Sequence, residues 1–183
     1  MNEQFNLALV SEVITAAIPD REVMVWRDRR LTYGQLGDRS RRLASYLHGR
    51  GLGARTPRAQ LAGHESGQDH VALFMHNGNE YLESMLGCFK SRTVPVNVNY
   101  RYVAEELQYL FLNSRSRAVI YHGCFADRVD ELRSELDVLI QVDDGSGTPL
   151  LPGAVDYETV LAESPSVLPD IGHSPDDLYL LYT

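Results

Sequence analysis

Short amides and tyrosines gather in one stretch, 97–102, which reads NVNYRY and follows an apolar run typical of a buried strand. Open α/β sheets bind ligands outside the carboxyl ends of their strands, so these side chains could face a ligand cleft. The alternative is structural. Asn97 and Asn99 would then bond the turn backbone and cap the next helix. Tyr100 and Tyr102 would pack on the flank of that helix.

Motifs for several well-defined chemistries are missing from the sequence. No G-x-G-x-x-G turn and no Walker A loop occur, which argues against dinucleotide and P-loop enzymes. The serine-hydrolase signature G-x-S-x-G is also missing, and we interpret Gly-Ser-Gly at 145–147 as a flexible loop. The six histidines have neither H-x-x-x-H nor H-E-x-x-H spacing, so we expect no metal site.

The basic residues permit two interpretations. Arg39, Arg41 and Arg42 share one expected helix, and with Arg50 they could form a basic patch for a membrane or for phosphates. The alternative is an ordinary solvated helix face. Lys90 is the single lysine and lies at the end of an expected helix. There its charge complements the helix dipole, so we expect a structural role.

Composition indicates a globular protein. The 183 residues are 44% hydrophobic and 23% charged, and 17 basic against 25 acidic residues argue against nucleic acid as a partner. No apolar run approaches the roughly 20 residues that span a bilayer. The N-terminus contains acidic Glu3 and has no basic region, which argues against a signal peptide, so we expect a cytoplasmic protein. Cys88 and Cys124 lack C-x-x-C spacing, and we expect both to be buried hydrophobes.

Strand and helix signals alternate along the chain, which predicts an α/β fold with a mostly parallel sheet flanked by helices. The expected helices span 5–17, 32–49, 79–89, 103–113, 125–136 and 156–161. The expected strands span 22–26 and 30–32, as a hairpin or a bent strand pair, then 71–75, 94–98, 118–121, 138–142 and 178–182. Thr32 and Gln35 have capping-box spacing. We expect the last strand to be buried on both faces in mid-sheet, so that Leu180→Asp would unfold the domain.

Several of these stretches resemble the AMP-forming adenylating enzymes, a family that includes acyl-CoA synthetases, peptide-synthetase adenylation domains and luciferases. The matching stretches read RLTYGQL (30–36), SRRLA (40–44), GLG (51–53), VALFMHNGNEY (71–81), LGCFK (86–90), VPVNVN (94–99), EEL (105–107) and DDLYLLYT (176–183). Their order and spacing match from about Pro19 to Thr183. The amino-acid sequence at 65–70 and 97–102 most resembles that of bacterial synthetases for fatty acids or steroid side-chain acids.

The resemblance implies an acid–thiol ligase with ATP, CoA and Mg2+ as cofactors and a small carboxylic acid as substrate. The carboxylate would attack the ATP α-phosphate, and CoA would then accept the acyl group. Tyr182 and Thr183 would stand at the start of the ATP phosphate loop and bind the cofactor. No catalytic or metal-binding residue is implied within the chain, and the substrate-binding residues are unknown. The four arginines of the patch would be candidates for the CoA phosphates.

The resemblance also bears on domain organisation. Residues 1–183 would form a partial N-terminal adenylating domain, without the nucleotide loop and without the C-terminal domain that carries a catalytic lysine. We therefore expect the chain alone to be inactive and to bind no cofactor tightly. Segment 54–66 is extra relative to the compact turn of the family, and we interpret it as a surface insertion. Segment 143–153 is rich in Asp, Gly and Pro and is expected to be a loop.

Two other classes of function stay open at this stage. The chain could be a non-catalytic binding or interaction module that keeps the α/β fold. It could also belong to an unrelated α/β enzyme that binds a nucleotide without a Gly-rich turn. Cytoplasmic location with peripheral membrane contact is a further possibility that the arginine patch allows.

Overall fold

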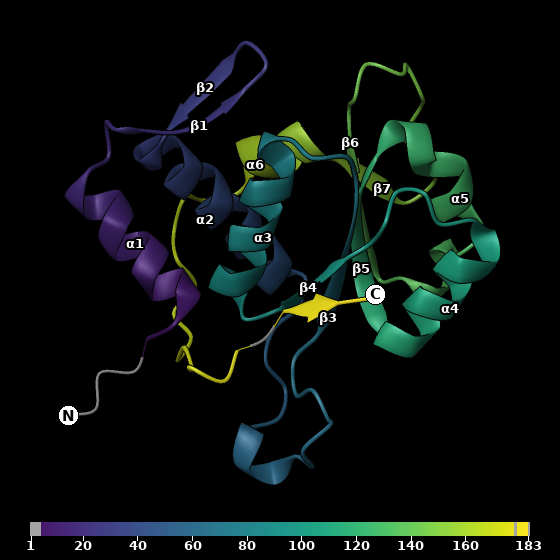
Figure 1. Cartoon of the computed structure of the whole chain (residues 1–183), viewed down its shortest axis with the longest axis horizontal. Coiled ribbons are helices and arrows are strands. Elements are labelled where there is room, and N and C mark those ends of the chain that lie inside the picture. The colour runs from purple at the N-terminus through teal and green to yellow at the C-terminus, as the bar shows by residue number, and fades with distance from the viewer. Residues whose placement is uncertain (1–4, 178, 183) are drawn as a thin grey trace.

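A parallel sheet forms the centre of the computed structural model (Figure 1), which describes residues 5–177 and 179–182. Its six strands have the order β7-β6-β5-β3-β4-β8, and each neighbouring pair is parallel. The strands are β3 (His70–Phe74), β4 (Val94–Asn97), β5 (Ser116–His122), β6 (Val138–Val142), β7 (Ala154–Asp156) and β8 (Leu180–Leu181). The predicted α/β class and parallel sheet are confirmed.

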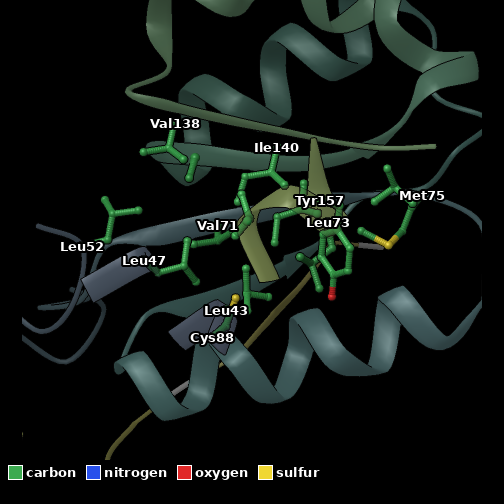
Figure 2. Close-up of a cluster of buried hydrophobic side chains, with 14 of the residues drawn as sticks. Leu43, Leu47, Leu52, Val71, Leu73, Met75, Cys88, Val138, Ile140 and Tyr157 are labelled. Carbon is green, nitrogen blue, oxygen red and sulfur yellow. The ribbon is translucent and has the colours of Figure 1, made fainter. Parts of the chain in front are cut away.

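Helices cover both faces of this sheet (Figure 1). They are α1 (Leu7–Ala17), α2 (Tyr33–Gly49), α3 (Asn79–Ser91), α4 (Ala104–Ser114), α5 (Ala126–Asp130) and α6 (Tyr157–Glu163), with 3-10 turns η1 (Arg58–Gln60), η2 (Gly123–Phe125) and η3 (Arg133–Glu135). Side chains alternate along each strand, so one set packs on α2, α3 and α6 and the other on α4 and α5. Figure 2 shows the first set, where Leu43 and Cys88 meet Val71 and Ile140 of the sheet.

A separate antiparallel hairpin, β1 (Glu22–Trp26) and β2 (Arg29–Thr32), leads into α2. Thr32 caps α2 by accepting a hydrogen bond from the Gln35 amide, while the Gln35 side chain accepts one from the Thr32 amide. The predicted hairpin and capping box are therefore confirmed. The hairpin pairs with no strand of the main sheet in the described part of the chain.

Helix α1 is present, but its apolar side chains face outward. The regularly spaced Phe5, Leu9 and Val13 indicated the helix, and they are 73%, 40% and 69% exposed. Ala8 and Thr15 are the buried members. The spacing thus predicted the helix without identifying the side that packs.

Two expected elements differ in extent. The helix predicted over 125–136 is interrupted, because α5 ends at Asp130 and the chain continues through η3. Short helical turns place Val129, Leu132 and Leu136 on the sheet as well as a continuous helix would, so the apolar spacing did not distinguish them. Strand β7 was not predicted, because its three residues are too few to show a period.

The prediction that the last strand is buried in mid-sheet is wrong for the part of the chain that the structure describes. There β8 pairs with β4 alone and forms an edge of the sheet. Leu180 is half-buried and Leu181 is 60% exposed, so Leu180→Asp would place its charge near solvent. Leu178 and Thr183, which also belong to the predicted strand and loop start, lie outside the described residues.

Segment 54–66 projects from the body between α2 and β3 (Figure 1). Its base is closed by an isolated bridge between Ala54 and Gln68 and by a 2.7 Å ion pair from Arg55 to Asp69. Its status as an insertion relative to the family stays a prediction. None of the helices in the described ranges is long and apolar enough to cross a bilayer.

Candidate functional site

A cleft of about 760 Å3 lies at the carboxyl end of the central strands. Its floor consists of residues that end or follow β3, β4 and β5, and its sides are the tip of the hairpin and the loop after β6. The lining residues are 26–29 from the hairpin, 76–80 after β3, Tyr100 after β4, His122 and Cys124 at the end of β5, and 143–146 after β6. This is where open α/β sheets bind ligands.

Rings form the floor of the cleft around His76. Its centroid lies 4.6 Å from that of Tyr100, 4.9 Å from Phe125 and 5.7 Å from His122. The His76 amide donates a 3.2 Å hydrogen bond to Nδ1 of His122. Burial, reinforced by His76 and opposed by Asp144, lowers the pKa of His122, so that ring is a neutral acceptor. Such a platform suits a planar ligand group that can stack.

The two sides of the cleft differ in their charged groups. Asp144, on the loop side, accepts hydrogen bonds from the amides of Cys124 at 2.9 Å and Ser146 at 3.0 Å. Although partial burial opposes it, hydrogen bonds from the side chains and the amides of Cys124 and Ser146 hold the pKa of Asp144 well below its usual range, so the carboxylate stays ionised. Arg27, on the hairpin side, makes no ion pair within the described part of the chain. The loop side is therefore acidic, whereas the hairpin side presents the Arg27 guanidinium beside the Asp28 carboxylate.

Cys124 is exposed at this cleft, whereas Cys88 is buried as predicted. The prediction of burial is wrong for Cys124 because it lies in the turn directly after β5, at the end of the sheet. Partial burial of the thiol and the Asp144 carboxylate raise the pKa of Cys124 to about 12. The thiol therefore stays protonated at neutral pH and is a poor nucleophile.

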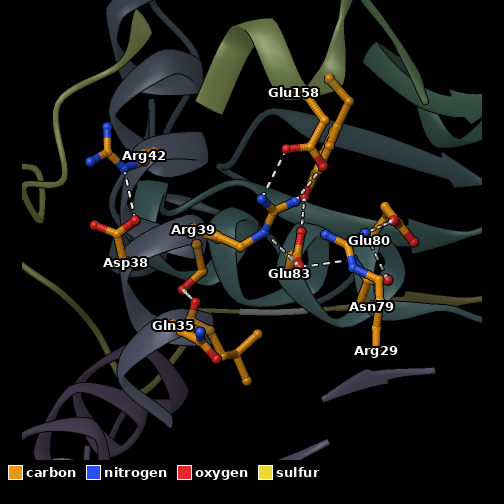
Figure 3. A network of polar contacts seen from close by, with 12 residues as sticks. Arg29, Gln35, Asp38, Arg39, Arg42, Asn79, Glu80, Glu83 and Glu158 are labelled. Atoms are coloured by element: carbon orange, nitrogen blue, oxygen red, sulfur yellow. Dashed lines mark hydrogen bonds and ion pairs between the residues drawn. The ribbon is translucent and has the colours of Figure 1, made fainter. Parts of the chain in front are cut away.

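A buried carboxylate, Glu83 on α3, joins three helices beside the cleft (Figure 3). It accepts from the Tyr157 hydroxyl at 2.9 Å and forms a 2.8 Å ion pair with Nε of Arg39. Arg39 also donates to both oxygens of Glu158 at 2.6 and 2.9 Å. Although burial opposes it, these two carboxylates raise the pKa of Arg39, so the guanidinium stays charged. The buried charge of Glu83 is therefore paired with a cation within the protein, while the second carboxylate, Glu158, is half exposed.

The same network extends to the hairpin through the start of α3. Asn79 donates to Glu83 at 3.0 Å and accepts from Nη1 of Arg29 at 3.4 Å. Arg29 also forms a 3.1 Å ion pair with Glu80. Asn79, Glu80 and Arg29 line the cleft, so the network ends at its rim.

The predicted basic patch is not formed as such, because its arginines are occupied within the protein. Arg39 pairs as described above, Arg41 lies 3.3 Å from Glu12, and Arg42 lies 2.8 Å from Asp38. Arg50 lies over the ring of Tyr46 at 5.9 Å. The solvated-face interpretation also fails for Arg39, whose side chain is only 17% exposed.

Lys90 has a structural role, which comes from a buried ion pair rather than from the expected interaction with the helix dipole. Its side chain is fully buried at the end of α3, and Nζ lies 2.6 Å from Glu12 and 2.7 Å from the Ser40 hydroxyl. Burial lowers the pKa of Lys90, and Glu12 opposes the shift. The ammonium group thus joins α1, α2 and α3.

In the stretch 97–102, some residues fit the structural interpretation and others fit the ligand-cleft interpretation. Asn99 accepts from the Arg101 amide at 3.0 Å within the turn, as the structural interpretation required. Asn97 instead accepts from the Tyr81 hydroxyl at 3.0 Å. Tyr100 lines the cleft, as the functional interpretation required, while Tyr102 packs against the second core cluster.

The helix cap after this stretch comes from neither amide. Glu106 accepts from the Val103 amide at 3.0 Å and so closes the first turn of α4. The capping part of the structural interpretation is therefore wrong.

Tyr182 lies away from the cleft. It follows β8, which is separated from β3 by β4, and its hydroxyl donates to Asn113 of α4 at 2.8 Å. Burial raises the pKa of Tyr182. Its expected partner in the phosphate loop, Thr183, is outside the described residues.

The sequence matches the family model described as AMP-binding enzyme over residues 12–183. The chain belongs to this AMP-binding enzyme family. It is 53% identical over 182 residues to the medium-chain acyl-CoA ligase Mig of Mycobacterium avium, covering 98% of this chain and 33% of that protein. It is 34% identical over 182 residues to a 3-oxocholest-4-en-26-oate–CoA ligase of Rhodococcus rhodochrous, covering 97% and 30% respectively. The chain thus spans about a third of the length of these relatives.

Solved structures agree with the AMP-binding assignment at the level of the fold. An anthranilate CoA ligase, AuaEII, in complex with anthranoyl-AMP, superposes over 100% of this chain and 33% of its own with a TM-score of 0.83 at 17% identity. The inhibitor-bound N-terminal domain of FACL13 from Mycobacterium tuberculosis gives 0.77 at 23% identity, over 97% and 41%. The fold is that of the N-terminal domains of such ligases, as the resemblance implied.

Sequence reasoning missed most of the cleft in this AMP-binding chain. His76, His122 and Asp143 each stand where a predicted strand ends, and that shared position was the available signal. The hairpin side had no such signal, because Trp26 and Arg27 reach the cleft only through the packing of the hairpin.

Proposed function

We propose that the chain is the N-terminal part of an AMP-forming ligase that converts a fatty acid or a steroid side-chain acid to its CoA thioester. The 53% identity to a medium-chain acyl-CoA ligase carries this proposal, and a medium-chain acid is therefore its first substrate. The intact enzyme would use ATP, Mg2+ and CoA. The 183 residues contain no Ser/Thr/Gly-rich loop ending in Pro-Lys-Gly, so the chain alone is expected not to form acyl-adenylate.

The cleft is the part of the chain that offers a nucleotide site. Rings at His76 and Tyr100 can stack on a base, and the Asp144 carboxylate can accept from hydroxyl or amino groups. The Arg27 guanidinium, which makes no ion pair with the described residues, can bind a phosphate on the opposite side. A ligand with a neutral planar end and an anionic end matches this distribution, as an adenine nucleotide does.

CoA is the nucleotide that we assign to the cleft. The resemblance puts the ATP phosphates beside Tyr182 and Thr183, which follow β8 at the edge of the sheet, and Tyr182 does not line the cleft. Two nucleotide substrates thus have two places at the carboxyl end of one sheet. The affinity of this chain alone is expected to be weak, because the cleft is open and the rest of the enzyme is missing.

Activity of the intact enzyme, translated from its full reading frame, tests the overall proposal. Thioester formation would be measured with a medium-chain fatty acid and, separately, with a steroid side-chain acid. ATP- and CoA-dependent product from either acid supports the ligase function. An intact enzyme that releases no AMP with either acid contradicts it.

The cleft assignment can be tested on the 183-residue chain by NMR, which detects weak binding to a 20.6 kDa protein. CoA, adenosine 3′,5′-bisphosphate and inorganic phosphate would be titrated separately. Amide shifts at Gly78, Gly123 and Gly145, with none at the remote Gly49 and Gly63, support the site. Tyr100→Ala should reduce the shifts. Equal effects of phosphate alone would contradict recognition of a nucleotide.

A further inference from the structure

The two sides of the cleft are attached to the molecule in different ways. The loop side continues directly from β6, and buried Gln141 of β6 donates to the loop carbonyl of Thr148 at 3.0 Å. The hairpin side has no backbone pairing with the main sheet in the described residues. An isolated two-stranded hairpin is marginally stable, so side-chain contacts must set its place.

Two contacts hold the tip of the hairpin against the floor of the cleft. The Arg29 guanidinium reaches Glu80 at 3.1 Å and Asn79 at 3.4 Å. Trp26 lies over the turn before α3, where a Cβ added at Gly78 would be 3.6 Å from the indole nitrogen. Arg29 makes the polar contacts, while Trp26 lies within van der Waals reach of the Gly78 turn.

The partners of Arg29 are themselves fixed. Asn79 and Glu80 begin α3, and buried Glu83 holds the Asn79 amide (Figure 3). The Glu80 side chain is 15% exposed, whereas Arg29 is 46% exposed. The more exposed member of the contact is therefore on the hairpin, and its less exposed partner is at the start of α3.

We infer that Arg29 is a positioning residue that holds the hairpin over the cleft and so sets the place of Arg27 and Trp26 for a bound nucleotide. This inference rests on the proposed CoA site for its functional consequence, although the attachment itself does not. Its neighbour Arg30 offers a matched comparison. Arg30 is on the same strand and pairs with Glu22 at 2.7 Å, but it does not line the cleft.

The test uses Trp26, the single tryptophan of the chain, as a reporter of hairpin position. Acrylamide quenching of its fluorescence would be compared in the unsubstituted chain, Arg29→Ala, Arg29→Lys and Arg30→Ala, with circular dichroism to verify folding. Quenching should rise in Arg29→Ala, recover in part in Arg29→Lys and stay unchanged in Arg30→Ala. Unchanged quenching in Arg29→Ala overturns the inference.

CoA binding gives the second readout in the same variants. Arg29→Ala should weaken CoA binding about fivefold, the effect of losing one partly exposed ion pair, and Arg30→Ala should not. Higher quenching with unchanged CoA affinity overturns the positioning role. If the unsubstituted chain shows no CoA-dependent shifts, the proposed function of the cleft fails. The quenching comparison then still decides whether Arg29 fixes the hairpin.

Discussion

The central strands and the last strand of one sheet differ in how fully they are enclosed. Strands β3 and β6 are buried along their whole lengths, whereas β8 is a two-residue edge with Leu181 60% exposed. The central strands end in a cleft with a floor and two sides, while β8 ends at Leu181 and is followed by Tyr182, which bonds Asn113 of α4. On our proposal, the cleft serves CoA within this chain, and the β8 end serves ATP only together with other parts of the intact enzyme.

The largest expected effect comes from placing a carboxylate in each region. Ile120 in β5 is fully buried, so Ile120→Asp should cost about 4 kcal/mol or more and unfold the chain. Leu180→Asp should cost about 1–2 kcal/mol, because β8 is an edge and the carboxylate can reach solvent. Urea denaturation followed by circular dichroism gives both values. Equal losses would show that the two regions are equally enclosed.

A second comparison isolates the buried charges beside the cleft. Arg39→Ala leaves Glu83 buried without its cation and should cost about 3 kcal/mol of unfolding free energy. Arg42→Ala, on the same helix, removes a partly exposed i,i+4 pair with Asp38 and a 2.8 Å hydrogen bond to the Ser164 carbonyl, and it should cost about 1–2 kcal/mol. Thermal or urea denaturation measures the difference. Similar costs for the two arginines would contradict the central place of Glu83.

The free energy of unfolding should decrease as the pH falls, because His122 at the cleft is buried. Burial lowers the pKa of His122 below its ordinary 6.5, so the imidazole binds its proton less tightly when folded than when unfolded. Unfolding then takes up a proton, and stability is lost as pH falls below about 6.5 towards the lower folded pKa. His122→Asn keeps an acceptor for the His76 amide and should reduce this loss.

Exposed His48→Asn is the matched control for this pH effect. Unfolding free energies between pH 7 and pH 5 would be compared for the three proteins. Identical pH dependence in His122→Asn and the unsubstituted chain would mean that His122 does not contribute.

The smallest effect is expected at the amino end of the sheet, far from both regions. Removal of residues 57–64 with a short Gly-Ser link should change stability by about 1 kcal/mol or less, since loop closure depends weakly on length. The deletion keeps Arg55, paired with Asp69, and Ser66, which lies 2.7 Å from Nε2 of His70. Denaturation midpoints give the answer, and loss of folding would show that the segment supports the core.

Much of the fold was predictable from the sequence because local signals and tertiary packing agree there. The Thr32 capping box and the apolar runs of β3 and β6 specify their elements directly. The edge position of β8 was not predictable, because the apolar residues of a strand do not indicate which other strands pair with it. The role of Lys90 was equally hidden, since its partner Glu12 lies on another helix.

The candidate site was predictable only in part, for a physical reason. Tyr100 follows a strand and was considered for a ligand cleft. Its companion His76 was considered only as one of the six histidines that lack metal-binding spacing. The charged sides depend on long-range packing, such as the contact of Arg29 with Glu80, 51 positions apart in sequence. No local period encodes such a contact.

The most direct test of the account separates the two half-reactions in the intact enzyme. Fatty-acid-dependent ATP–pyrophosphate exchange reports the ATP half, and the KM for CoA in thioester formation reports the CoA half. Tyr100→Ala, in the cleft, should raise the KM for CoA about tenfold, the loss of one stacking contact, and leave the exchange rate unchanged. Loss of pyrophosphate exchange in Tyr100→Ala with an unchanged KM for CoA would contradict the assignment of the cleft to CoA.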